Sequence, residues 1–280
     1  MSIAFLFPGQ GSQAVGMGSD VFNRFPELVE QANETVGYSL SSICLEDADG
    51  VLGQTQFTQP ALYLVSFLAA KALIEDGKSP AFAAGHSVGE FAALATAGCV
   101  SFLDGLRMVQ KRGEIMSKVS GGGMAAVIGL DRDSIKKVLD ESGNDQVDLA
   151  NFNSPSQIVI SGPANQINNS LEPLKSGGAR MVVPLKVSGA FHSRMMETPA
   201  QEFSAFIQNV EFSQPNFPVY SNVEAVPYPD AQSIKSLLIR QIHSSVRWSE
   251  LISQLRNDGA TEFTECGPGN VLSKLLRQIP

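Results

Sequence analysis

The order of apolar and amphipathic runs between residues 124 and 187 constrains the fold more than any other feature. In sequence, the runs predict a strand at 124–130, a helix at 131–143, strands at 147–152 and 156–162, a helix at 164–178 and a strand at 179–187. Short β-branched runs favour strands, whereas apolar residues three and four apart favour helices. The order βαββαβ is typical of a ferredoxin-like unit, in which one sheet carries two helices.

The chain on both sides of this unit predicts a second, larger α/β part. An apolar strand at 3–7 stops at Pro8 and Gly9, and alternation of helix and strand returns after residue 188. The glycine triplet at 121–123 suggests a hinge before the insert. We therefore expect an α/β fold, with a large subdomain formed by residues 1–123 and 188–280 and a small ferredoxin-like subdomain at 124–187.

Composition excludes several classes of protein. The 280 residues are 43% hydrophobic and 17% charged, which predicts a packed core, and the net charge of −8 argues against a nucleic-acid partner. No apolar stretch reaches ~18 residues, so no membrane span is expected, and the N-terminal run lacks the features of a signal peptide. Three distant cysteines favour neither a disulfide framework nor a metal site, so a reducing cytoplasm is expected.

One serine stands in a pattern that predicts a nucleophile. Ser87 lies between Gly85 and Gly89, after a predicted strand at 81–84 and before a predicted helix at 88–97. This is the G-x-S-x-G elbow, in which a tight turn exposes the hydroxyl and the amide of Val88 points toward a developing oxyanion. A serine that merely caps the helix is the alternative interpretation.

A serine nucleophile needs a base, and the chain has only three histidines. His86 adjoins Ser87 and should point away from it across the turn. His243 lies late in a predicted helix, where a packed or surface role is the better default. His192 follows a strand end and a loop, a usual place for a base, and is therefore the best candidate.

The loop "FPGQGSQ" at 7–13 is a second candidate for the active site. It has no following GK[ST], so it is not a P-loop, and Ala14 breaks the dinucleotide-binding fingerprint. A glycine-rich loop at the end of a strand can supply backbone amides to a site. A tight structural turn is the alternative.

Arg112 is the most informative charge. Other charged residues of the predicted helix at 101–119 share a solvated face, whereas Arg112 falls beside Met108 and Ile115 on the apolar face. A guanidinium there is costly without an anionic partner. That partner is either a structural carboxylate, the commoner case, or the carboxylate of a substrate held by two hydrogen bonds.

Taken together, these features resemble the malonyl-CoA:acyl carrier protein transacylase family over essentially the whole chain. The motifs that carry the resemblance are "FPGQGSQ", "GHSVGE", "MVQKRGEIM", "GGGMAAVIGL", "NFNSPSQIVISG", "GAFHS", "RQIHSSVRW" and "ECGPGNVL". Within the family, "NSPSQIVISGP" and "FHSRMM" look most like the discrete acyltransferases that serve modular polyketide synthases in trans. Housekeeping transacylases of fatty-acid synthesis share most of the motifs and remain an alternative.

The resemblance implies a role for each matching residue. Ser87 and His192 match the acylated nucleophile and its base, and Arg112 matches the arginine that binds the malonyl carboxylate. The amides of Gln10 and Val88 match the oxyanion hole. The resemblance also implies a hydrolase-like α/β core, malonyl-CoA and an acyl carrier protein or carrier domain as partners, and no cofactor.

Two further residues are implied to contribute to the site. Gln241 matches a glutamine near the histidine, where a neutral group orients the ring. Phe191 should stand beside the acyl α-carbon and disfavour a methyl branch. Ser245 departs from the proline that the family often has before "VRW", so the backbone that follows Gln241 can differ from the family's here.

Two other classes of protein share part of this pattern. A serine esterase or acyl hydrolase would use Ser87 and His192 but would not need Arg112. An inactive carrier-binding module could keep the fold, but the intact serine and histidine argue against it.

Overall fold

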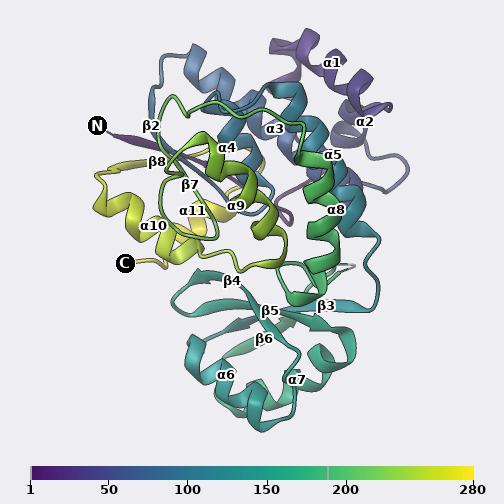
Figure 1. The fold of residues 1–280 in the computed structure, drawn as a ribbon, viewed down its shortest axis with the longest axis vertical. Helices are drawn as coiled ribbons and strands as arrows, with labels where there is room; N and C mark the ends of the chain where they lie inside the picture. The colour runs from purple at the N-terminus through teal and green to yellow at the C-terminus, as the bar shows by residue number, and fades with distance from the viewer. Residues whose placement is uncertain (1, 188) are drawn as a thin grey trace.

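A computed structural model describes residues 2–187 and 189–280, and it has two lobes (Figure 1). The large lobe is built on a parallel sheet with the strand order β7-β2-β1-β8. These strands are β1 (Ile3–Phe7), β2 (Pro80–Gly85), β7 (Val219–Tyr220) and β8 (Glu262–Glu265). Residue 1 and residue 188, at which two predicted segments begin, lie outside the described residues.

Helices cover both faces of the parallel sheet. They are α1 (Pro26–Val36), α2 (Leu40–Leu45), α3 (Thr55–Glu75), α4 (Gly89–Thr96), α5 (Phe102–Ser117), α8 (Glu197–Ile207), α9 (Ala231–His243), α10 (Trp248–Asn257) and α11 (Val271–Leu276), with 3-10 turns η1 (Phe22–Arg24) and η2 (Arg194–Met196). Phe5 and Phe7 of β1 are fully buried in one core with Phe91 of α4, while Leu6 points into a second core beneath α10. This alternation explains why β1 is apolar throughout.

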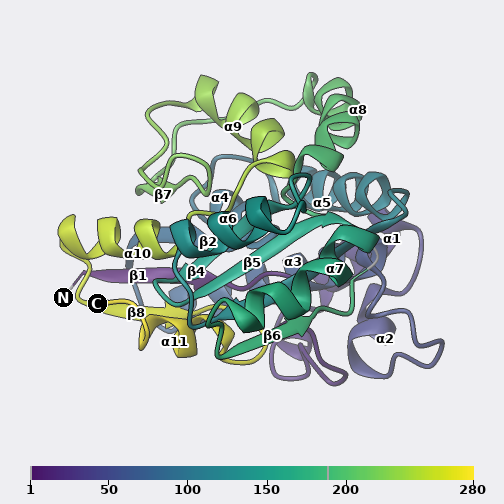
Figure 2. The same cartoon turned by 90° about the horizontal axis from the view of Figure 1, so that it is seen from below.

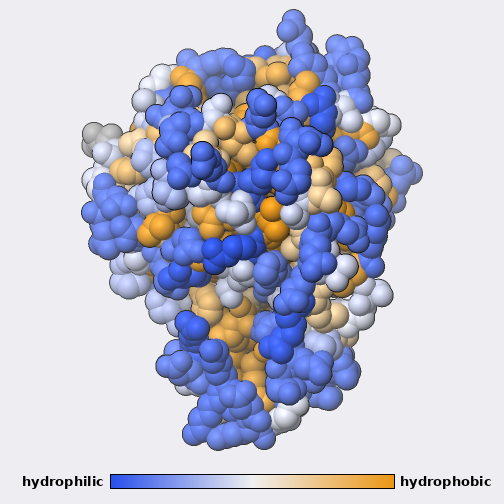
Figure 3. All heavy atoms as spheres, in the orientation of Figure 1, coloured by the Kyte–Doolittle hydropathy of each residue, from blue (hydrophilic) through white to orange (hydrophobic). Residues whose placement is uncertain are grey.

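Helix α3 is an interior helix. Among the described residues it is the one helix long and apolar enough to cross a membrane, with a mean hydropathy of 1.4 over its most apolar 18 residues. The expectation that no apolar stretch reaches ~18 residues was therefore wrong for this helix, in which polar residues are scattered among the apolar ones. In the fold, 67% of its most apolar window is buried, and it packs on α4 and α5. Mostly hydrophilic side chains cover the visible face of the molecule (Figure 3).

The small lobe is an antiparallel sheet with the strand order β4-β5-β3-β6 (Figure 2). Its elements are β3 (Gly122–Ile128), α6 (Arg132–Glu141), β4 (Asp148–Ser154), β5 (Gln157–Pro163), α7 (Ala164–Ser176) and β6 (Met181–Pro184). The two helices pack on one face of this sheet, where Ile135 and Leu174 are buried. Order and connectivity are those of the ferredoxin-like pattern, so the expected fold class is confirmed. The subdomain boundaries at 123/124 and 187/188 stay predictions.

The glycine triplet at 121–123 is less of a hinge than the sequence suggests. Gly121 turns the chain with φ +75°, but Gly122 and Gly123 already belong to β3. A Cβ on Gly122 would lie 2.5 Å from the backbone nitrogen of Ala190. Close approach of two backbone segments therefore accounts for that glycine better than flexibility does.

A short segment after α9 joins the two lobes. The Val246 amide donates to the Ala150 carbonyl at 2.8 Å, and the Phe152 amide donates to the Val246 carbonyl at 2.9 Å. The Ser245 hydroxyl adds a bond to the Leu149 carbonyl at 2.6 Å. Strand β4 thus gains a parallel neighbour from the large lobe along its free edge.

Candidate active site

Ser87 occupies a strained turn between β2 and α4. Its φ is +53°, a conformation that non-glycine residues rarely adopt. The flanking glycines allow the turn, since a Cβ on Gly85 would lie 2.0 Å from the Gly89 carbonyl carbon and one on Gly89 would lie 2.1 Å from the Phe7 oxygen. The geometry is that of the predicted nucleophile elbow.

His192 lies within hydrogen-bond distance of the serine. Its Nε2 is 2.7 Å from Ser87 Oγ. Its Nδ1 is 2.8 Å from the Gln241 carbonyl oxygen and 3.1 Å from that of Ser244, so Nδ1 carries the proton and Nε2 can accept one. Burial, and then the charge of Arg112, lower the pKa of His192 to about 3. The imidazole is therefore neutral at physiological pH, as a general base must be.

The other two histidines lie away from the serine hydroxyl. His86 Nε2 is 2.8 Å from Asn153 Oδ1, and its ring packs against Trp248 at 5.4 Å between centroids. His243 is the last residue of α9. Both placements agree with the preference for His192.

Arg112 is buried beside Ser87 and is 1% exposed. Its guanidinium donates to Gln59 Oε1 at 2.8 Å, to Gln241 Oε1 at 2.8 Å and to Ser87 Oγ at 3.2 Å. All three acceptors are neutral, and within residues 2–187 and 189–280 no carboxylate forms an ion pair with Arg112. Burial lowers its pKa to about 9, and the charge of Glu90 opposes that shift.

Gln241 lies beside His192, where the resemblance implied a neutral group that orients the ring. Its backbone carbonyl, not its side chain, orients the His192 ring. The side-chain nitrogen donates to the Ser87 carbonyl at 2.8 Å and to Glu90 Oε2 at 2.7 Å. Helix α9 is regular through Gln241, so the serine at 245 leaves this backbone intact. Glu90 is a residue that the sequence analysis missed, although its place among apolar residues in "GEFAALA" was a signal.

A cavity of about 90 Å³ opens onto the serine. It is lined by Gln10, Gln59, His86, Ser87, Val88, Arg112, Met116, Met124, Asn151, Leu185, Val187, Phe191 and His192. The backbone amides of Gln10 and Val88 make no hydrogen bond to another residue in the described part of the chain, so both are free for an oxyanion. The Gln10 side chain is held separately, by Thr55 Oγ1 at 3.1 Å.

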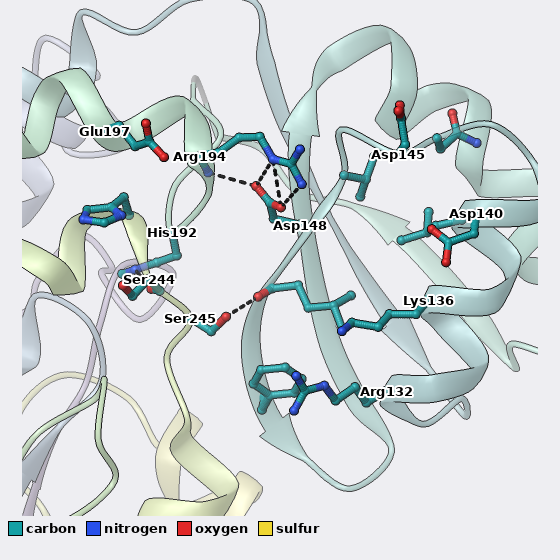
Figure 4. Close-up of a pocket in the computed structure, with 16 residues that line it drawn as sticks. Arg132, Lys136, Asp140, Asp145, Asp148, His192, Arg194, Glu197, Ser244 and Ser245 are labelled. Carbon is teal, nitrogen blue, oxygen red and sulfur yellow. Dashed lines mark hydrogen bonds and ion pairs between the residues drawn. The ribbon is translucent and has the colours of Figure 1, made fainter.

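A larger groove of about 620 Å³ runs between the lobes and reaches the other side of His192 (Figure 4). Arg132 and Lys136 of α6 line its far side. Asp148 on β4 accepts from the backbone and guanidinium of Arg194, the shortest of these contacts being 2.6 Å. Over the described ranges, no group of three or more His, Cys, Asp or Glu side chains could hold a metal ion.

Comparison with known proteins agrees with this geometry. The acyl transferase domain family matches residues 4–279. The chain is 48% identical over 99% of its length to the polyketide biosynthesis malonyl CoA-acyl carrier protein transacylase PksC of Bacillus subtilis, and covers 96% of that protein. It is 50% identical over 99% of its length to the polyketide biosynthesis protein ThaF of Burkholderia thailandensis, but spans only 24% of that longer protein.

A solved structure shows the same fold. The malonyl CoA-acyl carrier protein transacylase from Burkholderia pseudomallei superposes with a TM-score of 0.95 at 44% identity, covering 100% of this chain and 98% of that one. The chain therefore belongs to the acyl transferase domain family, among the malonyl CoA-acyl carrier protein transacylases.

Proposed function

We propose that this protein moves a malonyl group from malonyl-CoA to the phosphopantetheine thiol of an acyl carrier protein, through an ester on Ser87. One observation carries the proposal. A buried guanidinium that has only neutral hydrogen-bond partners lies 3.2 Å from the serine hydroxyl. An acyl group that carries its own carboxylate would supply the missing anion at that distance from the nucleophile.

The first half-reaction acylates the serine. His192 Nε2 takes the Ser87 proton as Oγ bonds to the thioester carbonyl carbon. The amides of Gln10 and Val88 stabilise the oxyanion, because both donors are already in place before charge develops. The carbon–sulfur bond then breaks, and the proton on His192 passes to the sulfur of coenzyme A.

The second half-reaction transfers the malonyl group. The pantetheine thiol gives its proton to His192, sulfur attacks the ester carbonyl carbon, and Oγ leaves with that proton. The groove of Figure 4 has a volume of about 620 Å³ and reaches His192, so it is the route by which we expect the pantetheine arm to enter. The Arg132 and Lys136 side chains on its rim suit the phosphate of that arm. All groups in these proposed steps belong to the chain and its two substrates, so the proposal calls for no cofactor.

We place the enzyme in the cytoplasm and in polyketide synthesis, serving its synthase in trans. Both relatives compared above carry polyketide biosynthesis in their names, at 50% and 48% identity. The housekeeping role in fatty-acid synthesis uses the same chemistry and is the alternative. The rate of malonyl transfer to a polyketide synthase carrier, compared with the rate to a fatty-acid synthesis carrier, distinguishes the two roles.

The intact mass of the protein after incubation with malonyl-CoA tests the activity. One added malonyl group should appear, and it should move to a carrier protein in its holo form when that is supplied. A serine hydrolase would instead release free malonate at the same rate with and without carrier. That result would contradict transfer.

Arg112→Ala should lower malonyl transfer at least ~10-fold while acetyl transfer is spared or improved. The guanidinium is the partner of the malonyl carboxylate, and its removal opens apolar space for a short monoacyl chain. Arg107→Ala is the matched control, because Arg107 lies on the exposed face of the same helix and pairs with Asp104. Equal losses for the two acyl groups in Arg112→Ala would make Arg112 a structural residue.

Phe191 should govern the choice of extender unit. The residue is 6% exposed and lines the cavity beside Ser87 and Arg112. We expect malonyl to be preferred over methylmalonyl at least ~10-fold, because overpacking one methyl group in a filled site is costly. Phe191→Ser should narrow that ratio, although it can also loosen His192 and slow both reactions. Competition between the two CoA esters, with the loaded carrier read by mass, would contradict this if the ratio stayed constant.

A further inference from the structure

Glu90 is a buried carboxylate that the proposed chemistry does not use. It lies in the first turn of α4, three residues after Ser87, and is fully buried. One oxygen, Oε1, accepts from the Asn222 amide at 3.1 Å and from the Tyr228 hydroxyl. The other oxygen, Oε2, accepts from Gln241 Nε2 at 2.7 Å. In the described structure it has no ion-pair partner.

The Gln241 amide lies between this carboxylate and Arg112. Its Nε2 uses both protons, one on the Ser87 carbonyl and one on Glu90, and its Oε1 accepts from Arg112 at 2.8 Å. The reversed amide would place an NH₂ group against the guanidinium and an oxygen against two acceptors. Only one orientation therefore satisfies all the neighbours.

Two acceptors select that orientation, and only Glu90 is a side chain. The Ser87 carbonyl is fixed by the turn. Burial raises the pKa of Glu90 to about 7, opposed by the bonds from Tyr228, Gln241 and Asn222 and by the charge of Arg112. Burying a carboxyl group has a large desolvation cost, so we expect Glu90 to do more than fill space in the core.

We propose that Glu90 is a positioning residue for carboxylate selectivity: it holds the Gln241 oxygen toward Arg112 and so keeps the guanidinium aimed at the acyl pocket. This inference rests on the proposed function, since it assumes that Arg112 binds the malonyl carboxylate. Glu90 acts only through Gln241, so it should affect acyl groups that carry a carboxylate and not those that lack one.

Glu90→Gln separates this role from simple packing, because the two side chains have nearly the same shape. Two donors converge on Oε1, so the new amide should keep its oxygen there and turn its NH₂ toward Gln241. The side-chain amide of Gln241 must then either reverse or lose the hydrogen bond from its Nε2 to residue 90. The reversed amide no longer offers its oxygen to Arg112. We expect malonyl transfer to fall ~10-fold, the scale for a hydrogen bond to a buried charge, while acetyl transfer changes less than ~2-fold.

The malonyl-to-acetyl ratio is the readout, because both rates come from one preparation and the fraction of folded enzyme cancels. Tyr228→Phe is the matched control. It removes a bond to the same carboxylate without facing Gln241, so the ratio should stay at the wild-type value. In a Gln241→Leu background, Glu90→Gln should cause no further change in the ratio.

The outcomes distinguish this inference from the function on which it rests. If Arg112→Ala shifts the ratio and Glu90→Gln does not, the positioning role is wrong and the proposed function stands. If neither variant shifts the ratio, both the assignment of Arg112 and the positioning role of Glu90 are wrong. If Glu90→Gln abolishes transfer of both acyl groups, the carboxyl supports the Ser87 turn through Asn222 and the proposal is overturned.

Discussion

Ser87→Ala should leave the protein without any malonyl adduct and lower malonyl transfer more than ~10⁴-fold, the scale for loss of a serine nucleophile. The reason is local. Ser87 Oγ is the atom that both His192 Nε2 and the Arg112 guanidinium reach, at 2.7 and 3.2 Å. Intact mass after incubation with malonyl-CoA measures the adduct directly.

Ser117→Ala is a suitable control for that experiment. Ser117 is a half-buried serine at the end of α5, and its hydroxyl bonds to Gln56 and to its own helix. It should acquire the malonyl group like the wild type. An equal adduct on Ser87→Ala would show that another residue is acylated.

His192→Ala should slow acylation by ~10² to 10⁴-fold, the usual contribution of a general base. His243→Ala should leave the acylation rate at saturating malonyl-CoA nearly unchanged, because the bond to Ser87 Oγ comes from His192 and not from His243. Rapid-quench measurement of the acylation step separates the two variants. The opposite order of effects would mean that the base has been misassigned.

The low pKa of His192 adds a test on the wild type. A base works only when deprotonated, and a pKa of about 3 keeps the imidazole neutral down to that pH. The acylation rate should therefore show no loss from titration of His192 between pH 8 and pH 5. A fall centred near pH 6.5 that disappears in His192→Ala would contradict this assignment.

Much of the small lobe could be predicted from sequence because its signals are local. Each predicted element of residues 124–187 shows a single spacing of apolar residues, either that of a strand or that of a helix. The six elements occur in the predicted order, and their ends differ from the predicted ends by a few residues. The large lobe was harder. Helices α1, α2, α8, α10 and α11 were not predicted, and strand β7 has only two residues, Val219–Tyr220. Such short elements are determined by packing against distant residues, which a local pattern does not contain.

The residues of the candidate active site likewise differ in whether a local sequence pattern indicates them. Ser87 has a local signature in the sequence, because the turn needs a residue without a Cβ at both position 85 and position 89. Arg112 could be singled out because it breaks the polarity of its own helix. Gln241 and Glu90 lie 151 residues apart in sequence, and nothing local indicates that they touch. Their contact depends on how α4 and α9 pack, so it became visible only in the fold.

The junction at residues 244–246 has a consequence for recombining such enzymes. Strand β4 holds Ser245 and Val246 by three hydrogen bonds, and the neighbouring Ser244 carbonyl is one of the two acceptors that orient His192. Asp148 on the same strand binds Arg194, two residues beyond that histidine. The small lobe therefore cannot be exchanged without changing contacts close to His192. A chimera that exchanges residues 124–187 would also exchange the strand that contacts Arg194 and residues 245–246, on either side of the His192 contacts. We therefore expect such a chimera to keep its activity only when these segments come from the same parent.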